Sequence, residues 1–136
     1  MRSATKVDLI ASVPLFAGLS KSELGQVASI ADEIDLPADK LLIREGQRGR
    51  EFFVLLEGEV EVTRKGKKLA TRGSGDFFGE IALVSSVPRT ATVKTTKPVR
   101  AFVIRDVEFR GLLRKTPAIA VKVLEAVADR LSQDVL

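Results

Sequence analysis

One acid and one base interrupt an otherwise apolar stretch, FFGEIALVSSVPRTATV, at residues 77–93. Burying a charge without a partner costs free energy, so Glu80 and Arg89 either face water or meet a polar group. Arg89 offers a planar, permanently charged fork that suits phosphate oxygens, and ionised Glu80 accepts hydrogen bonds from hydroxyl groups. Gly79 would let a ligand approach the unsatisfied N–H groups at the start of a short helix over residues 79–83. Together these residues predict a pocket for a phosphate attached to a sugar.

The same pattern also fits a purely structural role, which the residues alone leave open. Glu80 at the start of a helix would complement the helix dipole, and Arg89 would simply pair with Glu80. Gly73, Gly75 and Gly79 lack the spacing of a dinucleotide-binding fingerprint. No G-x-x-x-x-G-K-[ST] phosphate loop is present either.

The composition excludes most site chemistry, because the 136 residues include neither Cys nor His. This removes thiolates, His general bases and most zinc, copper and iron sites, and no Asp-rich calcium loop occurs. We therefore expect no metal, no cofactor and no catalysis. The net charge of +4 suits a small anionic ligand but is too mild to predict nucleic-acid binding. The basic run RKGKKLATR at residues 64–72 is interpreted as a solvated hairpin tip, since no Trp or Tyr is present to stack on bases.

The length predicts a single domain over residues 1–136. No signal peptide and no apolar run of about 18 residues is present. The sequence thus predicts no membrane span, and a cytoplasmic protein or the cytoplasmic piece of a larger one.

The spacing of apolar residues predicts the elements that must position this acid and base. Residues 7–32 have helical character, with a capping box formed by Ser20 and Glu23. Residues 34–105 form short apolar segments broken by Gly, Pro and Asp. EVEVTR at residues 59–64 alternates strictly, and the Lys-Gly pair that follows is typical of a hairpin turn. Such strands predict a mainly β fold with flanking α-helices, an antiparallel β-roll or jelly-roll barrel.

Helical character returns over residues 106–135. Asp106 is predicted to cap a helix that ends near Lys115, and Pro117 to open a last helix over residues 118–134. The apolar arc of the last helix is unusually wide, which favours burial against both the β-roll and a partner. That partner would be an effector domain or a second copy of the chain, held through the C-terminal helix.

FGEIALVSSVPRTATV closely resembles the phosphate-binding cassette of cyclic nucleotide-binding domains, with the pattern F-G-E-[ILM]-A-L, a short spacer and P-R-[TSA]-A-[TS]-V. VPLFAGLSKSEL resembles the N-terminal helical segment of this family, and GQRGREFFVLLEGEVEV resembles its strand–turn–strand signature. The resemblance is to the bacterial type of the domain and covers nearly the whole chain. It implies an antiparallel β-roll with N-terminal helices, a short phosphate-binding helix and C-terminal lid helices.

The resemblance also implies a role for each residue of the cassette. Glu80, helped by the Gly79 backbone, would accept the ribose 2′-hydroxyl, and Arg89 would neutralise the cyclic phosphate. Backbone N–H groups of Ala82 and Thr90 would complete the phosphate cradle. The Thr90 hydroxyl permits a contact with guanine in the syn form, and an ordinary strand threonine is the alternative. The implied ligand-binding residues are Gly79, Glu80, Ile81, Ala82, Arg89 and Thr90.

A lid over the purine is implied as well. Arg130, thirteen residues after Pro117, resembles the cap arginine of some bacterial members, and a solvated helix arginine is the alternative. Val127 or Leu131 would close the pocket instead. Core packing explains the remaining wall candidates equally well: Val62, Leu69 and Leu83.

The function that the resemblance implies is a regulatory module, which binds cAMP or cGMP and transmits binding through its C-terminal helices. One alternative is a degenerate member that has lost its ligand and serves as an interaction module. Another is the sensor fragment of a larger channel, kinase or transcription regulator. Nucleic-acid binding by this chain alone is not expected, because the sequence contains no recognition helix.

Overall fold

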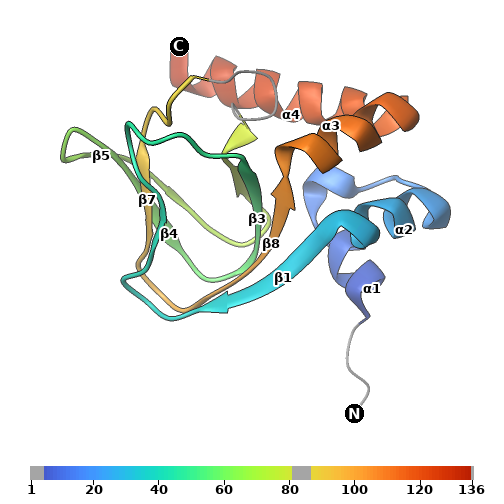
Figure 1. Cartoon of the computed structure of the whole chain (residues 1–136), viewed down its shortest axis with the longest axis horizontal. Helices are drawn as coiled ribbons and strands as arrows, with labels where there is room; N and C mark the ends of the chain where they lie inside the picture. Colours follow the sequence, from blue (N-terminus) through green and yellow to red (C-terminus); the bar gives the residue numbers. More distant parts are fainter. Residues whose placement is uncertain (1–4, 81–86, 136) are drawn as a thin grey trace.

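The computed structural model describes residues 5–80 and 87–135. Two curved antiparallel sheets form the body of the molecule, with helices beside them and above them in the view of Figure 1. The predictions for Ile81, Ala82 and Leu83 lie outside the described residues, as does most of the short helix expected over residues 79–83.

The sheets confirm the predicted β-roll. One sheet has the strand order β1-β8-β3-β6 and the other β2-β7-β4-β5, and all of these pairings are antiparallel. The strands are β1 (Ala31–Leu36), β2 (Leu41–Ile43), β3 (Glu51–Glu57), β4 (Val60–Arg64), β5 (Lys67–Arg72), β6 (Phe77–Phe78), β7 (Thr92–Thr95) and β8 (Val99–Arg105).

The β4–β5 hairpin follows from the alternation in EVEVTR. Its two turn residues, Lys65 and Gly66, have φ angles of 50° and 79°. Positive φ at both central positions is what a tight two-residue hairpin turn requires, and glycine adopts it without strain. Val62 is paired with Ala70, and the register shifts by one residue just after this pair.

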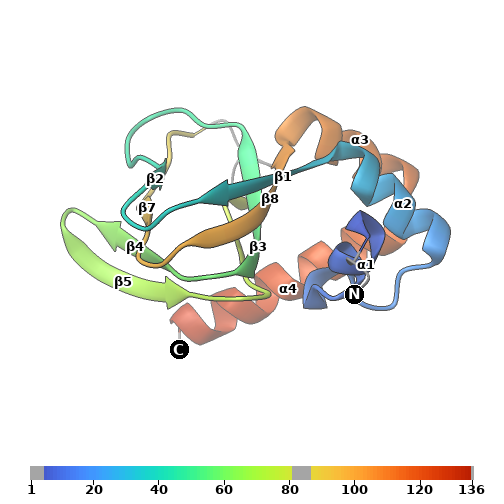
Figure 2. The ribbon, with the colours of Figure 1, turned by 90° about the horizontal axis from the view of Figure 1, so that it is seen from below.

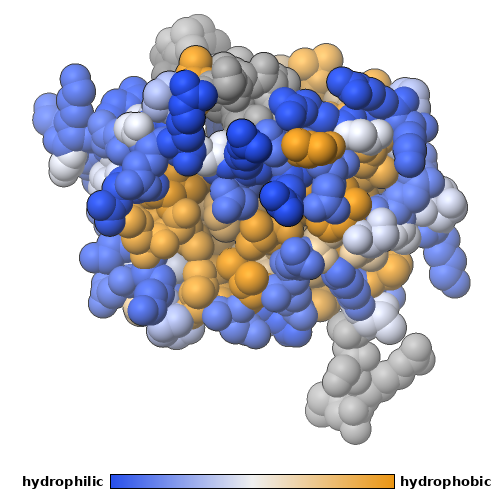
Figure 3. Space-filling view, in the orientation of Figure 1, coloured by the Kyte–Doolittle hydropathy of each residue, from blue (hydrophilic) through white to orange (hydrophobic). Residues whose placement is uncertain are grey.

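Two hydrophobic clusters hold the fold together. One cluster joins the helices to β3 and β8, and includes Phe52, Phe102 and Phe109. The other fills the β-roll and includes Phe53 and Phe78. In Figure 3 apolar side chains gather in the middle of the face that looks into the roll, and hydrophilic side chains surround them.

The N-terminal helices are shorter than predicted. They are α1 (Lys6–Ala11), the 3₁₀ turn η1 (Pro14–Phe16) and α2 (Lys21–Ile30), and the predicted capping box at Ser20 and Glu23 is present. The prediction of helical structure over residues 7–32 was therefore wrong at its C-terminal end. Ala31 and Asp32 begin β1, where they pair with β8, and Ala31 is buried. Sheet pairing outweighs the helical spacing that Ala31 shares with the residues before it.

The C-terminal helices are α3 (Asp106–Lys115) and α4 (Pro117–Val135). Asp106 is the first helical residue rather than the cap, which is Arg105. The Asp106 carboxylate accepts from the N–H of Val107 at 2.8 Å, so it satisfies a donor of the first turn from inside the helix. α4 runs across the end of the β-roll, as Figures 1 and 2 show from two directions. Within the described residues, no helix has the length and apolarity that a membrane span requires.

Candidate functional site

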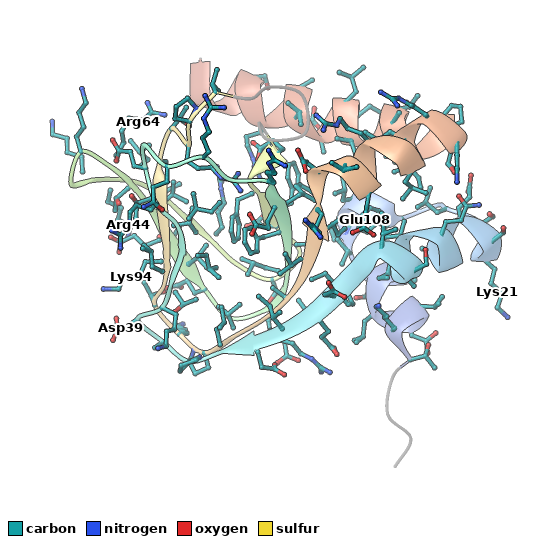
Figure 4. All side chains as sticks on the ribbon, in the orientation of Figure 1. Lys21, Asp39, Arg44, Arg64, Lys94 and Glu108 are labelled. Atoms are coloured by element: carbon teal, nitrogen blue, oxygen red, sulfur yellow. The ribbon has the colours of Figure 1, made fainter. Side chains whose placement is uncertain are left out.

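A cavity of about 490 Å³ opens between the β4–β5 hairpin, the end of β6, the segment before β7, and α4. This volume lies in the range of small-molecule sites. In Figure 4 Arg64 lies at the upper end of the roll, on the side of α4, whereas Asp39 lies at the lower end. The described lining residues are Ile43, Val62, Arg64, Leu69, Ala70, Arg72, Phe78, Gly79, Glu80, Val87, Pro88, Arg89, Thr90, Ala91, Val93 and Arg130.

Arg89 is fixed at one side of this cavity by the turn that leads into β3. Its N–H donates to the carbonyl of Gln47, and its carbonyl accepts from the N–H of Gly46, both at 2.8 Å. Its Nη2 donates to the carbonyl of Glu51 at 2.7 Å, and its Nη1 donates to the carbonyl of Gly79 at 3.3 Å. The side chain is only 9% exposed. A guanidinium has five N–H donors, so donors of Arg89 remain for a ligand.

Two glycines make room for this guanidinium. A Cβ atom at Gly49 would overlap Nε of Arg89, so no larger residue fits there unless the arginine moves. Gly79 has a φ of +87°, and its Cβ would lie 2.8 Å from the carbonyl oxygen of Glu51. Gly79 was predicted to allow a close approach to the backbone. Gly49 was missed, although it lies within the quoted segment GQRGREFF.

The electrostatics of Arg89 reflect its burial. Burial lowers the pKa of the Arg89 guanidinium from its ordinary value, and the nearby carboxylates of Glu51, Glu80 and Asp106 act in the opposite direction. An arginine in this environment still carries its charge at neutral pH. Arg89 forms an ion pair with Glu51, whose Oε1 lies 3.9 Å from Nη2.

Glu80 pairs with Arg130 of α4 rather than with Arg89. The Glu80 Oε1 lies 3.1 Å from Arg130 Nη1, and the two side chains are 18% and 17% exposed. Arg130 Nη2 donates to the carbonyl of Phe77 at 2.5 Å, and the guanidinium carbon lies 3.9 Å from the centre of the Phe77 ring. The structural alternative, an ion pair between Glu80 and Arg89, is therefore not the arrangement found here.

The structure brings three of the other predicted residues to the cavity. Val62, Leu69 and Thr90 line it. Val127 packs instead against the hydrophobic cluster that joins the helices to β3 and β8. The side chain of Leu131 lies outside the described residues.

Two cavity arginines were missed in the sequence, where the run of residues 64–72 predicted only a solvated hairpin tip. Arg64 and Arg72 both line the cavity, and Nε of Arg64 donates to the carbonyl of Thr90 at 2.9 Å. The strand alternation gives the signal, since Val62 and Arg64 are two residues apart, as are Ala70 and Arg72. No cluster of acidic residues that could bind a metal occurs in the described part of the chain.

Comparisons with known proteins identify the relatives of this chain. The model of the family described as "Cyclic nucleotide-binding domain" matches residues 33–116. A cyclic nucleotide-gated potassium channel of Rhizobium etli is 33% identical over 122 residues, which is 90% of this chain and 34% of the channel. The chain spans about a third of the length of this and two similar bacterial potassium channels.

Solved structures show the same fold. The catabolite activator protein of Thermus thermophilus superposes with a TM-score of 0.80 and 26% identity, over 88% of this chain and 59% of that one. The cAMP-bound chain PfPKA-R superposes with a TM-score of 0.77 and 26% identity, over 93% of this chain and 45% of that one. The family model, the relatives and the fold agree, and this chain belongs to the cyclic nucleotide-binding domain family.

Proposed function

We propose that this chain binds a cyclic nucleotide, cAMP or cGMP, in the cavity beside Arg89. The observation that carries the proposal is the buried guanidinium of Arg89, which lines the cavity. Gly49 and Gly79 leave space for this guanidinium because they have no side chains. A cyclic phosphate carries one negative charge, and a guanidinium in a place of low dielectric binds it strongly.

The remaining cassette residues complete the proposed site. The Glu80 carboxylate accepts a hydrogen bond from the ribose 2′-hydroxyl, beside the backbone of Gly79. Backbone N–H groups of Ala82 and Thr90 bind the phosphate, and Ile81 belongs to the same proposed site. A relative solved with cAMP bound shares the fold and supports the assignment of a cyclic purine nucleotide as the ligand.

We propose that binding is coupled to α4 through Glu80. Arg130 already occupies an oxygen of Glu80, so the ribose hydroxyl and Arg130 must share or compete for this carboxylate. A ligand that changes the strength of the Glu80–Arg130 pair shifts the population of α4 positions by its differential affinity. Val121 and Leu124 of α4 are 54% and 68% exposed, and would meet the effector domain or a second copy.

The proposal describes a binding module and not an enzyme. Hydrolysis of a cyclic phosphate needs an activated water, from a metal or a general base. The sequence has no His, and the carboxylate of the cavity lining, Glu80, is paired with Arg130.

Calorimetric titration with cAMP and with cGMP tests the proposal. Arg89→Ala should weaken binding of both by about 2 to 4 kcal/mol, because a buried phosphate loses its charge partner. Lys94→Ala, an exposed cation on β7, is the control and should bind as the wild type does. Equal affinity of wild type and Arg89→Ala would contradict the proposal, and so would a wild type that binds neither nucleotide at millimolar concentration.

A further inference from the structure

We propose that a basic surface beside the cavity attracts the negatively charged nucleotide and steers it toward Arg89, so that this surface raises the rate of association. The inference rests on the proposed function, because it concerns how the same ligand reaches the same cavity. We call this surface the basic rim. It consists of exposed cations from residues 44–48, which follow β2, and from residues 64–68, at the β4–β5 turn: Arg44, Arg48, Arg64, Lys65, Lys67 and Lys68.

The basic rim is formed by two segments that are distant in the sequence and adjacent in the fold. The N–H of Lys65 donates to the carboxylate of Glu45 at 3.0 Å, which joins the two segments. Nε of Arg64 donates to the carbonyl of Thr90 at 2.9 Å. Arg64, Arg89 and Thr90 all line the cavity. The basic rim is therefore continuous with the edge of the cavity where the phosphate is proposed to bind.

The basic rim holds more positive charge than the molecule as a whole. Residues 44–48 and 64–68 contain six cations and one carboxylate, a net charge of +5, whereas the net charge of the chain is +4. The β4–β5 hairpin projects from the body of the molecule in Figure 1. In Figure 4 Arg44 and Arg64 lie on the side of this hairpin, and Lys21 lies at the opposite end of the molecule. An anion that approaches from the hairpin side thus meets a concentrated positive field.

This concentration of charge works against the stability of the hairpin. Arg64 and Lys67 are opposite each other in the β4–β5 register, and like charges directly opposite destabilise a sheet. Glu61, the nearest acid along β4, is opposite Lys94 of β7 instead. A negatively charged ligand near the basic rim would relieve part of this repulsion, whereas a structural role for the cations would require acidic partners beside them.

Steering has a kinetic signature that direct contact lacks. Charges at the rim of a site change the association rate and its dependence on salt, whereas contacts inside the site change the dissociation rate. Salt screens such charges over a Debye length of about 30 Å at 0.01 M ionic strength and about 3 Å at 1 M. The contribution of the basic rim should therefore be large at low ionic strength and absent at high ionic strength.

Stopped-flow binding of the whole chain to cAMP and to cGMP, each carrying an uncharged fluorophore, tests this inference. The fluorophore must be on the ligand, because the chain contains neither Trp nor Tyr. The test variant is Arg44→Glu/Lys68→Glu, which reverses one exposed cation in each segment outside the cavity lining. Its association rate should be about fivefold lower than that of the wild type at about 0.01 M ionic strength, and within about twofold of it at about 1 M. Its dissociation rate should stay within about twofold of the wild-type value at both.

Lys6→Glu/Lys21→Glu is the matched control. It changes the net charge by the same amount at exposed positions of α1 and α2, and Figure 4 shows Lys21 far from the labelled rim residues. Because the field of a charge falls with distance, its association rate should remain within about twofold of the wild-type rate at both ionic strengths. Urea unfolding of both double variants checks that they fold.

Equal association rates of the wild type and Arg44→Glu/Lys68→Glu at low ionic strength would overturn the inference and leave the proposed function standing. The same follows if the control slows association as much, because net charge alone would then explain the effect. A deficit that persists at high salt, or that appears in the dissociation rate, would assign Arg44 and Lys68 to direct contact with the ligand and also overturn steering. If the wild type binds neither the labelled nor the unlabelled nucleotides, the proposed function itself fails.

Discussion

At the scale of single residues, the position of Arg89 in the cavity depends on two residues that have no Cβ atom. Gly49 and Gly79 both leave the space that the Arg89 side chain fills. Gly49 does so without a positive φ, so its role is steric and not conformational, whereas Gly46, three residues earlier, has a φ of +86° and open space around it. Gly46 and Gly49 therefore serve different purposes in the same turn, one conformational and the other steric.

This contrast predicts opposite effects of two alanine substitutions. Gly49→Ala should displace Arg89 and weaken cyclic nucleotide binding by about tenfold or more, with a smaller change in the free energy of unfolding. Gly46→Ala should cost about 1 kcal/mol or more of stability through its left-handed backbone, and leave affinity nearly unchanged. Calorimetric titration and urea unfolding of both variants measure the two quantities. If Gly49→Ala binds normally, the steric account of Arg89 is wrong.

Residue types and spacing predicted the cassette because Glu80 and Arg89 lie close together in the sequence. Gly49 and Phe77 could not be found in this way. Each lies far from the cassette in the sequence or reaches the site through strand register, and only the folded chain brings these segments together. Thr90 shows the intermediate case, since its position in the cassette was readable but its bond to Arg64 was not.

At the scale of elements, Arg130 is a described side chain that links α4 to the β-roll near the C-terminal end of the helix. Arg130 makes an ion pair with Glu80, a hydrogen bond to the carbonyl of Phe77, and a cation–π contact with the Phe77 ring. The N-terminal half of α4 is held differently, by Ile119, which is fully buried in the helical core. The N-terminal end of α4 is thus held by the helical core. The C-terminal end is held by a contact with Glu80, the carboxylate proposed to bind the ligand.

Removing this attachment should loosen only the second half of the helix. In Arg130→Ala the local opening free energy near the C-terminal end of α4 should fall by about 1 to 2 kcal/mol, the value of a charged hydrogen-bonded contact that is mostly buried. Amide hydrogen exchange there should become about tenfold faster, while exchange around Ile119 stays as it is. Asp129→Ala, its exposed neighbour, is the control. Uniform acceleration along α4 would show that Arg130 does not form a local latch.

Element boundaries were predictable except where the sheet decides them. The hairpin at Lys65 and Gly66 and the start of α4 at Pro117 follow from residues with strong backbone preferences. The passage from α2 to β1 at Ala31 was missed because no Gly or Pro marks it. β8 pairs with Ala31 and Asp32, and this long-range pairing fixes the boundary.

At the scale of the whole molecule, β3 and β8 form a wall shared by both hydrophobic clusters. Neighbouring residues of β3 face opposite sides, because side chains alternate along a strand. Phe52 stacks on Phe109 at 5.1 Å in the helical cluster, and Phe53 stacks on Phe78 at 5.1 Å inside the roll. The inner cluster also supplies Ile43, Val62, Phe78 and Val93 to the cavity lining.

Adjacent core substitutions should therefore separate stability from binding. Phe52→Leu and Phe53→Leu should each cost about 1 to 2 kcal/mol of stability, and each variant should unfold in one transition because the wall couples the clusters. Phe53→Leu alone should also weaken cyclic nucleotide binding, since Phe78 beside it lines the cavity. Calorimetric scans at saturating cGMP measure both effects, because a ligand at about a hundred times its dissociation constant adds roughly 2.7 kcal/mol to the folded state. Two separate transitions, of which cGMP moves only one, would show that the shared wall does not couple the β-roll to the helices.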